Sequence, residues 1–543
     1  MKKILLFFFS LFFFHFSGHS QETFVTVTGT VIDESSGIPL AGANIIEKNT
    51  SNGVMTDFDG KFEIVVPINA TIVVSYVGFA PTEITAEENS DIEVNLQPDT
   101  STLNEIVVVG YGKQKKANLT GAVTTVNSEV LQSRPVPNVS QMLQGVVPGL
   151  NFQTSGLGGE LNAGLSFNIR GSGTIGSGSN SAPLVLIDGM EANLNAINPQ
   201  DIESITVLKD AAAAAVYGSR AAFGVILITT KEGKEGAPRV NYSNNFRFTS
   251  PLHLPNMMDS HTFALYWNEA ADNAGQAPPF SQEVIDRIIQ FQNGEIDYGT
   301  VPNPTGDRYQ YYTGSNANTD WFDELYKDYA FSQEHNLSVS GGTGKTTYYT
   351  SARFMNQGGL LAYGEDKFED YDFNTKVGTE ITDYIKFNTN TRFSRQNYNK
   401  PTQQNDLFYH NIARRWPTVP VRDPNGYFGD ASGEIPQLVQ GGRTDDLTDR
   451  LYLQGQLTIN PLEGWNIYTI ANYKSTNRNY HQDVLPAYTY DVAGNPFPVP
   501  VGWNAPGHSS VYEYNFKEDY FSTNIYSDYV FDLNEAQNFK VMA

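Results

Sequence analysis

Beyond Arg239, hydrophobic and polar positions of the chain alternate with a period of two. In the clearest stretch, Tyr371–Ile381, apolar residues and threonines at the odd positions are interleaved with polar residues or glycine at the even positions. After a short turn at 382–383 the alternation resumes from Ile385 to Phe393. Strands of about ten residues with one apolar face and one polar face are typical of transmembrane β-barrels. The pattern therefore predicts a barrel wall.

The same alternation predicts more strands, separated by connections that are short and long in turn. Short connections lie at 342–346, 382–383, 460–464 and 533–538, whereas tens of residues follow Phe248, Phe393 and Tyr473. Periplasmic turns of such barrels are short and extracellular loops are long, so the domain ahead of the first strand should lie on the periplasmic side. A soluble β-sandwich with similar alternation is the alternative. The further strands are Val240–Phe248, Leu337–Gly341, Thr347–Met355, Leu451–Ile459, Trp465–Tyr473 and Phe521–Phe531, and another begins at Phe539.

Residues 237–543 hold too few strands for a closed barrel around a second domain. An eight-stranded barrel only just accommodates its own side chains, and an open sheet leaves backbone groups unpaired in lipid. We therefore expect a partial outer-membrane β-barrel in a truncated or split product.

The region 119–236 mixes helical and strand patterns and predicts a compact domain. Asp188-Gly189 is a hairpin-type dipeptide. Pro148-Gly149 should end a short helix. The predicted helices are Val139–Val147 and Ala211–Tyr217, and the predicted strands are Leu184–Ile187, Ile202–Leu208 and Val225–Thr230.

Residues 22–98 contain several short apolar runs divided by turn residues, which predicts a small β-sandwich. Asp57 and Asp59 precede Gly60, but the rest of a twelve-residue calcium loop is missing, which favours a hairpin turn. Ahead of this module, residues 1–20 have the pattern of an export signal. Lys2 and Lys3 precede a 13-residue stretch that is too short to span a bilayer.

Composition narrows the classes of function. The chain has no cysteine, which excludes disulfides, cysteine metal sites and cysteine-linked lipid. Its 59 acidic residues against 35 basic ones give a net charge of −24, so nucleic acid is not an expected partner.

We expect a mainly β fold: an N-terminal β-sandwich, a mixed α/β plug domain, and then antiparallel strands of an incomplete transmembrane β-barrel.

No catalytic constellation is visible. The chain lacks the H-E-x-x-H metal motif. The Gly-rich stretch 170–178 does not sit in a βαβ unit, and Gly344-Lys345-Thr346 lacks the glycine that a phosphate loop needs at position 339, which is Val339. We expect turns at both places, no catalytic residues, no metal and no cofactor.

Four β-branched residues, Ile106–Val109, lie between a polar linker and a Gly-containing turn. They indicate either a buried strand or an extended segment that offers its backbone edge to a partner.

Longer stretches resemble SusC/RagA-type TonB-linked outer-membrane proteins. These are NEIVVVGYGKQKKANLTGAVTTV from Asn104, FNIRGSGTIG, PLVLIDGM, and IESITVLKDAAAAAVYGSRAAFGVILITTKEGKEG from Ile202. One departure is Phe223, where that family usually has Asn. GTVIDESSGIPLAGANI and TDFDGKFEIVVP resemble the carboxypeptidase-regulatory-like domain.

The resemblance implies a TonB box and linker at 103–118, a plug at 119–236 and a twenty-two-stranded barrel in a chain nearly twice this length. Lys113, Lys115 and Lys116 are interpreted as solvated linker. The TonB box is Glu105, Ile106, Val107, Val108, Val109, Gly110, Tyr111 and Gly112. The plug motif is Arg170, Gly171, Asp188, Gly189, Lys209, Asp210, Tyr217, Gly218, Arg220 and Gly224.

The implied function is TonB-dependent import of a bulky nutrient, a glycan oligomer or a peptide, across the outer membrane. The implied partners are TonB with its inner-membrane energising complex, a SusD-like surface lipoprotein and outer-membrane lipid. The alternative is a receptor or signal transducer for a siderophore or another ligand; a secreted enzyme is the third hypothesis. Loop aromatics considered for stacking on sugars are Tyr309, Tyr311, Tyr312 and Trp321.

Overall fold

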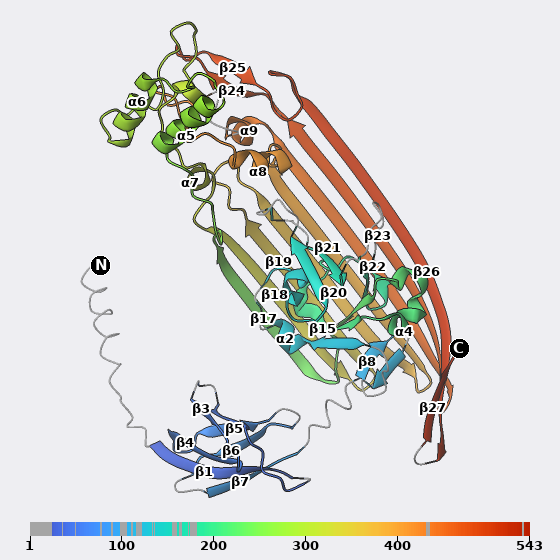
Figure 1. Cartoon of the computed structure of the whole chain (residues 1–543). Coiled ribbons are helices and arrows are strands. Elements are labelled where there is room, and N and C mark those ends of the chain that lie inside the picture. The colour runs from blue at the N-terminus through green and yellow to red at the C-terminus, as the bar shows by residue number, and fades with distance from the viewer. Residues whose placement is uncertain are drawn as a thin grey trace, which may run out of the picture. The chain divides into compact units, whose positions relative to one another are not determined.

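The computed structural model forms two compact units, residues 1–120 and 121–543 (Figure 1). The predicted signal at 1–20 lies outside the described residues. The structure describes residues 24–543 except 35, 49, 51, 77–78, 88–90, 98–105, 110–111, 116–121, 133, 135, 155–159, 162–164, 172, 174–181, 430–434 and 535–536.

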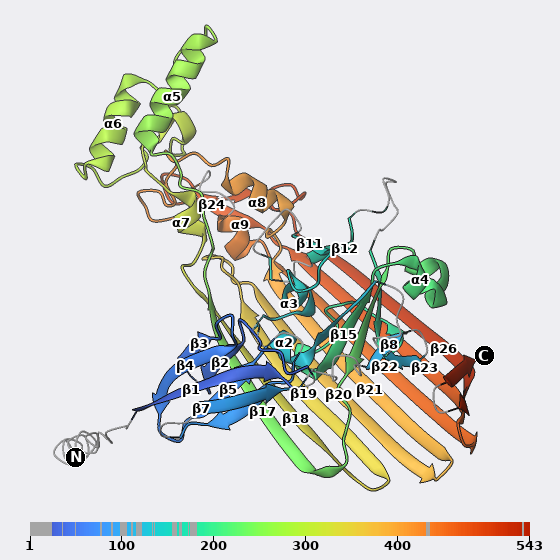
Figure 2. The same cartoon turned by 60° about the horizontal axis from the view of Figure 1, so that its bottom comes forward.

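The first unit contains the predicted β-sandwich (Figure 2). Two sheets, with strand orders β4-β1-β7 and β3-β2-β5-β6, enclose a core that includes Val27, Ile45 and Ile72. Side chains alternate between buried and exposed along β1 and β4, as expected for strands with one face on a core. The strands are β1 (Phe24–Asp33), β2 (Asn44–Glu47), β3 (Gly53–Met55), β4 (Lys61–Pro67), β5 (Thr71–Ser75), β6 (Thr82–Thr85) and β7 (Asp91–Leu96).

The turn at Asp57 exists, but the hairpin predicted there is wrong. An oxygen of the Asp57 carboxylate, Oδ1, accepts hydrogen bonds from the backbone N–H of Asp59 at 2.9 Å and of Lys61 at 2.8 Å. The flanking strands pair elsewhere, β3 with β2 and β4 with β1. The turn thus passes the chain from one sheet to the other.

The segment implied to be a TonB box is part of a two-stranded antiparallel sheet. Strand β8 (Ile106–Val109) pairs with β9 (Gly112–Lys115), with Ile106 opposite Lys115 and Val109 opposite Gly112. Glu105, Gly110 and Tyr111 lie outside the described residues. Lys113 and Lys115 belong to β9, so this part of the predicted solvated linker is a strand, and Lys116 lies outside the described residues.

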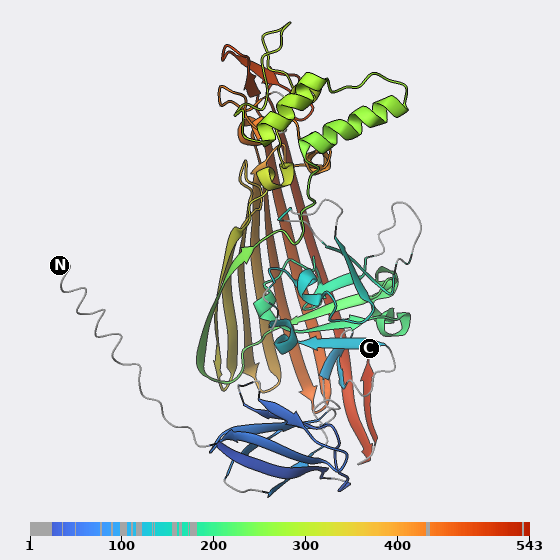
Figure 3. The same cartoon turned by 60° about the vertical axis from the view of Figure 1, so that its left-hand side comes forward.

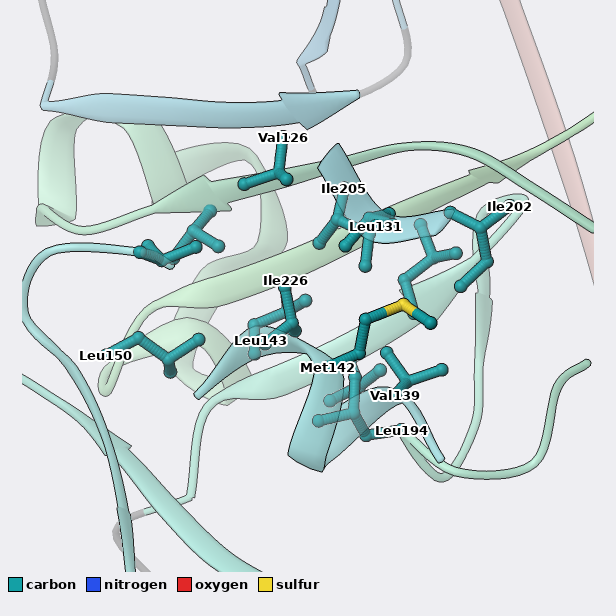
Figure 4. Packing of buried hydrophobic residues seen from close by; sticks show 14 of the residues in the cluster. Val126, Leu131, Val139, Met142, Leu143, Leu150, Leu194, Ile202, Ile205 and Ile226 are labelled. Carbon is teal, nitrogen blue, oxygen red and sulfur yellow. The ribbon is translucent and has the colours of Figure 1, made fainter. Parts of the chain in front are cut away.

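The mixed α/β domain is built on a sheet with the order β10-β15-β16-β13-β14. All three predicted strands are confirmed with the predicted bounds. Short helices pack on the sheet, so that Met142 and Leu143 meet Ile205 and Ile226 in its core (Figure 4). The elements are β10 (Val123–Asn127), α2 (Ser128–Gln132), α3 (Val139–Leu143), β11 (Leu150–Thr154), β12 (Leu165–Ile169), β13 (Leu184–Ile187), β14 (Met190–Glu191), η3 (Pro199–Asp201), β15 (Ile202–Leu208), α4 (Ala211–Ala214), η4 (Ala215–Ala221) and β16 (Val225–Thr230).

Both helices predicted here end earlier than expected. Helix α3 stops at Leu143 because Gln144 is extended, and Gly145 then has a φ of 75°. Helix α4 continues as the 3₁₀ segment η4, which is interrupted at Gly218 with a φ of 66° and a ψ of −151°.

A nine-stranded antiparallel sheet, here called the wall, follows, and the α/β domain lies against one of its faces (Figures 1 and 3). Its strands pair with their sequence neighbours, apart from the small β24–β25 hairpin between β23 and β26. The predicted strands are confirmed and extend further. They are β17 (Gly236–Thr249), β18 (Ala330–Thr343), β19 (Thr346–Gly358), β20 (Lys367–Thr382), β21 (Ile385–Pro401), β22 (Arg443–Leu462), β23 (Trp465–Val484), β26 (Ser510–Asn534) and β27 (Gln537–Met542).

The two faces of the wall differ as the alternation predicts. On β20, Tyr371 and Phe373 are more than two-fifths exposed, whereas Asp370 and Asn374 are buried on the face toward the α/β domain. The apolar face thus points away from that domain.

The long connections at one end of the wall strands fold into a cluster of their own, centred on Trp321 and Phe408. The turn predicted at Gly344-Lys345 joins β18 to β19 at the opposite end of the strands. Among the described residues, no helix combines the length and the apolarity needed to cross a membrane. The loop elements are α5 (Ser260–Asn273), α6 (Gln282–Gln292), η5 (Tyr312–Gly314), α7 (Trp321–Leu325), α8 (Asp406–Ile412), α9 (Ile435–Gln440), β24 (Ala487–Tyr490) and β25 (Pro496–Val499).

Candidate functional site

The predicted hairpin dipeptide Asp188-Gly189 forms the tip between β13 and β14. Ile187 pairs with Met190, and the two residues between them have φ angles of 50° and 81°. A two-residue turn with positive φ at both positions suits Asp followed by Gly. The turn thereby places the Asp188 carboxylate at the end of a fully buried strand.

Asp188 contacts three consecutive strands of the wall. Its carboxylate lies 3.2 Å from Nζ of Lys376 on β20 and accepts a hydrogen bond of 2.9 Å from the Asn390 amide on β21. Its backbone carbonyl accepts one of 3.0 Å from Gln454 on β22. Within the α/β domain, the backbone N–H and the hydroxyl of Thr230 donate to the same carboxylate at 3.0 and 2.8 Å. We call these five residues the anchor site.

At the centre of the anchor site, Asp188 and Lys376 form a charge pair, and each side chain is about nine-tenths buried. Burial alone would raise the pKa of Asp188, but Lys376, Arg392 and the Thr230 hydrogen bonds outweigh it and hold the pKa below its ordinary value. The carboxylate therefore stays ionised. A buried pair tolerates its desolvation only when such geometry and extra hydrogen bonds are present.

A second contact joins the two parts at Asp201, in η3. Its two carboxylate oxygens accept hydrogen bonds from the Tyr349 and Ser351 hydroxyls of β19, each at 2.8 Å. Burial raises the pKa of Asp201, although both hydroxyls act in the opposite direction. Sequence reasoning missed this residue. The available signal was a carboxylate directly ahead of the buried strand β15.

A third contact runs through Arg353 of β19, which is almost fully buried. Its guanidinium pairs with Glu334 at 2.9 Å and with Asp370 and Asp372 at 3.0 Å each. It also donates to the backbone carbonyl of Pro137 in the α/β domain at 3.0 Å. The polar face that the alternation predicted thus holds the α/β domain by ion pairs and hydrogen bonds.

A cavity of about 540 Å³ opens between the α/β domain and the wall. Its wall residues lie in three adjacent cross-strand rows, one of which runs Met355–Asp370–Gln396–Thr448–Arg478–Phe516. The size is typical of ligand pockets, which range over about 300–1,000 Å³. The cavity is lined by Pro137, Asn138, Leu161, Asn193, Asn195, Met355, Gln357, Phe368, Asp370, Gln396, Asp446, Thr448, Arg450, Thr476, Arg478, Tyr514 and Phe516.

Several predicted motif residues have local contacts inside the α/β domain. Asp210 caps α4 by accepting from the Ala213 N–H at 2.8 Å, and its other oxygen accepts from the Ala122 N–H at 2.6 Å. Lys209 donates to the Pro148 carbonyl at 2.6 Å. Gly224 has a φ of 92°, and a Cβ there would lie 2.7 Å from the Ile169 side chain.

The remaining motif residues lie at turns and on the surface. Arg170 and Gly171 have φ angles of 60° and 99° after β12, and Tyr217 and Gly218 lie in η4. Arg220 pairs with Glu191 at 3.1 Å on the surface. Of the motif residues, Asp188 contacts the wall directly, through Lys376, Asn390 and Gln454.

The loop aromatics considered for stacking on sugars are mostly packing residues. Trp321 is fully buried, Tyr309 is 7% exposed and Tyr311 packs against the loop cluster. Tyr312 is 53% exposed and makes an edge contact with Trp416. Within the described residues, no group of three His, Cys, Asp or Glu side chains is arranged to hold a metal ion.

Family models match both domains ahead of the wall. Residues 27–108 match the CarboxypepD_reg-like domain, and residues 115–225 match the TonB-dependent Receptor Plug Domain. The α/β domain is accordingly called the plug below.

The chain is also similar to curated receptors. It is 36% identical over 411 residues to TonB-dependent receptor P26 of Formosa agariphila, covering 74% of this chain and 37% of that protein. It is 31% identical over 405 residues to TonB-dependent receptor SusC of Bacteroides thetaiotaomicron, covering 72% and 36%. The chain belongs to the SusC-type TonB-dependent receptors. It spans little more than a third of the length of these two relatives, which are named as receptors and not as enzymes.

Solved structures of the RagAB system share the fold. The RagAB peptide importer in its open-open state superposes with a TM-score of 0.63 at 24% identity, over 79% of this chain and 47% of that one. The RagAB peptide transporter gives 0.60 at 25% identity, over 77% and 46%. The mainly β fold, with a plug on a transmembrane wall, is confirmed.

Proposed function

We propose that this SusC-type chain takes part in TonB-dependent import of a bulky nutrient, a glycan oligomer or a peptide, across the outer membrane. The observation that carries the proposal is the buried anchor site, where the plug is held on the polar face of the wall by Asp188 and Lys376. Its relatives support the same class of activity: SusC is a TonB-dependent receptor and RagAB a peptide importer.

The plug obstructs the polar face of the wall at rest. Opening a path requires the contacts at Asp188, Asp201 and Pro137 to break or rearrange. Because these contacts are buried, breaking them costs free energy, which an external source of work could supply. TonB, energised by its inner-membrane complex, is the proposed source.

The proposed TonB contact is the segment Glu105–Gly112. Strand β8 lies within it, and β9 covers one edge of β8. A partner strand can pair with the other edge through backbone hydrogen bonds, which is the strand-addition mode of recognition. Under this proposal the sandwich, the plug and the short turns face the periplasm, while the long loops face outward and meet a SusD-like lipoprotein.

Replacing Val108 tests the proposal in cells that carry the complete receptor with its partner lipoprotein. Val108→Pro removes a backbone N–H and disfavours strand pairing, whereas Val108→Thr keeps a β-branched side chain and the N–H. We expect Val108→Pro to abolish uptake of the labelled nutrient and Val108→Thr to keep it.

Binding of the nutrient to the cell surface is the control, because it needs no energy coupling. Both variants should bind as the wild type does. Uptake that survives both Val108→Pro and deletion of residues 105–112 would refute the proposal.

A further inference from the structure

The ion pairs between the plug and the wall all have the same polarity in the described part of the chain. Asp188 and Glu232 of the plug lie 3.2 and 3.8 Å from the ammonium group of Lys376 on β20. Glu160 of the plug lies 2.9 Å from the ammonium group of Lys400 on β21. The plug thus supplies the carboxylates and the wall supplies the cations.

Arg392 of β21 is a third wall cation at this interface. It is 6% exposed, and its Nη2 donates to the backbone carbonyl of Ile187 in the plug at 3.4 Å. Its Nε and Nη1 have no hydrogen-bond partner among the described residues. The carboxylates that act on it electrostatically include Asp188 and Asp201 of the plug. Much of the compensation for its charge therefore comes from the plug.

The described carboxylates on the plug-facing side of the wall strands already have wall cations as partners. The pairs are Glu334 with Arg247 and Arg353, Asp370 and Asp372 with Arg353, Glu380 with Lys386, Asp446 with Arg478, Glu518 with Lys474, and Asp528 with Lys540. Asp372 also interacts electrostatically with Arg392, but two other guanidinium groups of the wall, Arg353 and Arg450, act on it already. Displacing the plug would therefore leave its three wall cations without carboxylates of their own.

The three cations lie at two levels along the wall. Lys376 is opposite Asn390 on the neighbouring strand, and Arg392 follows two residues later on the same face of β21. Lys400 lies eight residues beyond Arg392, at the end of β21 that leads into the loop cluster. At about 3.3 Å per residue, roughly 26 Å of strand separates the two levels. We call Lys400 the loop-end station, and Lys376 with Arg392 the inner station.

Cations uncovered in a water-filled lumen attract anions. A surface with one sign of charge raises the local concentration of solutes of the opposite sign, and Lys or Arg side chains in a pore favour anions. While the plug is seated, its carboxylates occupy both stations. Because the group that leaves is a carboxylate in each case, a carboxylate of the nutrient fits the same ammonium and guanidinium donors.

We propose that the imported nutrient carries carboxylate groups, which replace the plug carboxylates first at Lys400 and then at Lys376 and Arg392 as the plug moves. The inference rests on the proposed import function. It adds the charge of the nutrient, whether the backbone of that nutrient is a glycan or a peptide.

The ion selectivity of the complete receptor in a planar lipid bilayer tests the inference. Urea is added until unfolding of the plug opens a conductance. The reversal potential in a gradient of potassium gluconate, a small carboxylate, then gives the permeability of gluconate relative to potassium. We expect the triple variant Lys376→Gln/Arg392→Gln/Lys400→Gln to lower this permeability ratio several-fold relative to the wild type.

The comparison separates a binding role of these cations from a purely structural one. The plug is unfolded in every variant, so lost plug contacts do not contribute to the difference. Arg395→Gln is the matched control, because Arg395 also lies on β21 but on the opposite face, where it pairs with Asp449 at 2.7 Å. It should leave the ratio unchanged. If the triple variant does not fold, Lys400→Gln decides, since its ion pair is about one-fifth exposed, and the ratio should fall in the same direction.

The inference is overturned if the permeability ratio is the same in the wild type and in the triple variant, or if Arg395→Gln lowers it equally. The bilayer measurement needs no TonB, so this failure leaves the import proposal standing. Uptake that survives both Val108→Pro and deletion of residues 105–112 would instead refute the import proposal, even where the triple variant changes the ratio.

Discussion

The Lys376 ammonium lies 3.2 Å from the Asp188 carboxylate, although 188 positions of sequence separate the two residues. One belongs to the wall and the other to the tip of a plug hairpin. Because both are buried, removing either charge would leave the other poorly compensated and weaken the seating of the plug.

Removing the charge of Asp188 should loosen the plug. Asp188→Asn leaves the buried Lys376 with only the more distant and exposed Glu232 carboxylate, at 3.8 Å, as a counter-charge, and breaking a buried pair costs about 3–5 kcal/mol. The chain has no cysteine, so a Thr206→Cys background places a single thiol at a plug position that is 3% exposed in the wild type. Thiol labelling of this background should be faster in Asp188→Asn. Arg220→Gln is the control, because an exposed pair contributes about 1 kcal/mol or less. Equal labelling rates in the two variants would contradict the assigned role.

The anchor at Asp188 should weaken in acid. Its pKa is lower in the folded protein than the ordinary value of 3.8, so its contribution is complete above that value and is lost as pH falls through the folded pKa. Labelling of the Thr206→Cys background should accelerate across that acid window. Asp188→Asn should lack this part of the pH dependence, and an unchanged profile in the variant would count against the pairing.

Asp201 should show the opposite dependence. Burial raises its pKa above 3.8, so the folded state binds the proton more tightly than the unfolded state does. Its contribution is fully present below 3.8 and is lost as pH rises through the folded pKa. Asp201→Asn should therefore remove a decrease in stability on the alkaline side of 3.8, measured by chemical denaturation over a pH series. A decrease of the same size in the variant would show that another group causes it.

Gly224→Ala should destabilise the plug more than Gly171→Ala. Both glycines have φ above 90°, but a Cβ at Gly224 would meet Ile169 at 2.7 Å and the Leu208 carbonyl at 2.9 Å, while nothing lies within 4 Å at Gly171. Each substitution carries a backbone cost of about 1–3 kcal/mol, so their difference isolates the steric overlap. Denaturation of the two variants under identical conditions measures it, and equal losses would exclude a steric effect.

Trp321→Ala should unfold the loop cluster, whereas Trp503→Ala should leave it intact. Trp321 is fully buried and its indole N–H donates to the Trp416 carbonyl at 3.0 Å, while Trp503 is fully exposed. Truncating a buried Trp costs about 3–5 kcal/mol. Limited proteolysis of residues 250–329 checks this: rapid cleavage is expected in Trp321→Ala alone, and resistance there would contradict the packing role.

Much of the fold follows from local patterns. The period-two alternation located the wall strands because each strand has one face toward the plug and one away from it. The neighbouring residues Phe373 and Asn374 therefore lie on opposite faces of the wall, the first exposed and the second buried. The predicted strands were too short, because apolar and polar residues no longer alternate clearly toward the ends of the observed strands.

Features that depend on distant residues could not be predicted in this way. Helices α5 and α6 fall in a stretch interpreted only as a long loop, and α5 is stabilised by Phe263 and Trp267 packing on Trp416, more than 140 positions away. Likewise, Lys376 and Asn390 were recognised as polar wall positions, but no local signal assigns them to Asp188.

The β8–β9 hairpin has a mechanical consequence for any force applied to it. Ile106 pairs with Lys115, so the strand that a partner would hold and the strand leading to the plug meet at the open end of the hairpin. Tension between them separates the rungs one after another instead of shearing all of them together. The same tension acts on the buried contacts of Asp188, but separation one rung at a time needs less force than breaking those contacts together, so β8 and β9 should part first and would extend by about 3.3–3.6 Å per residue.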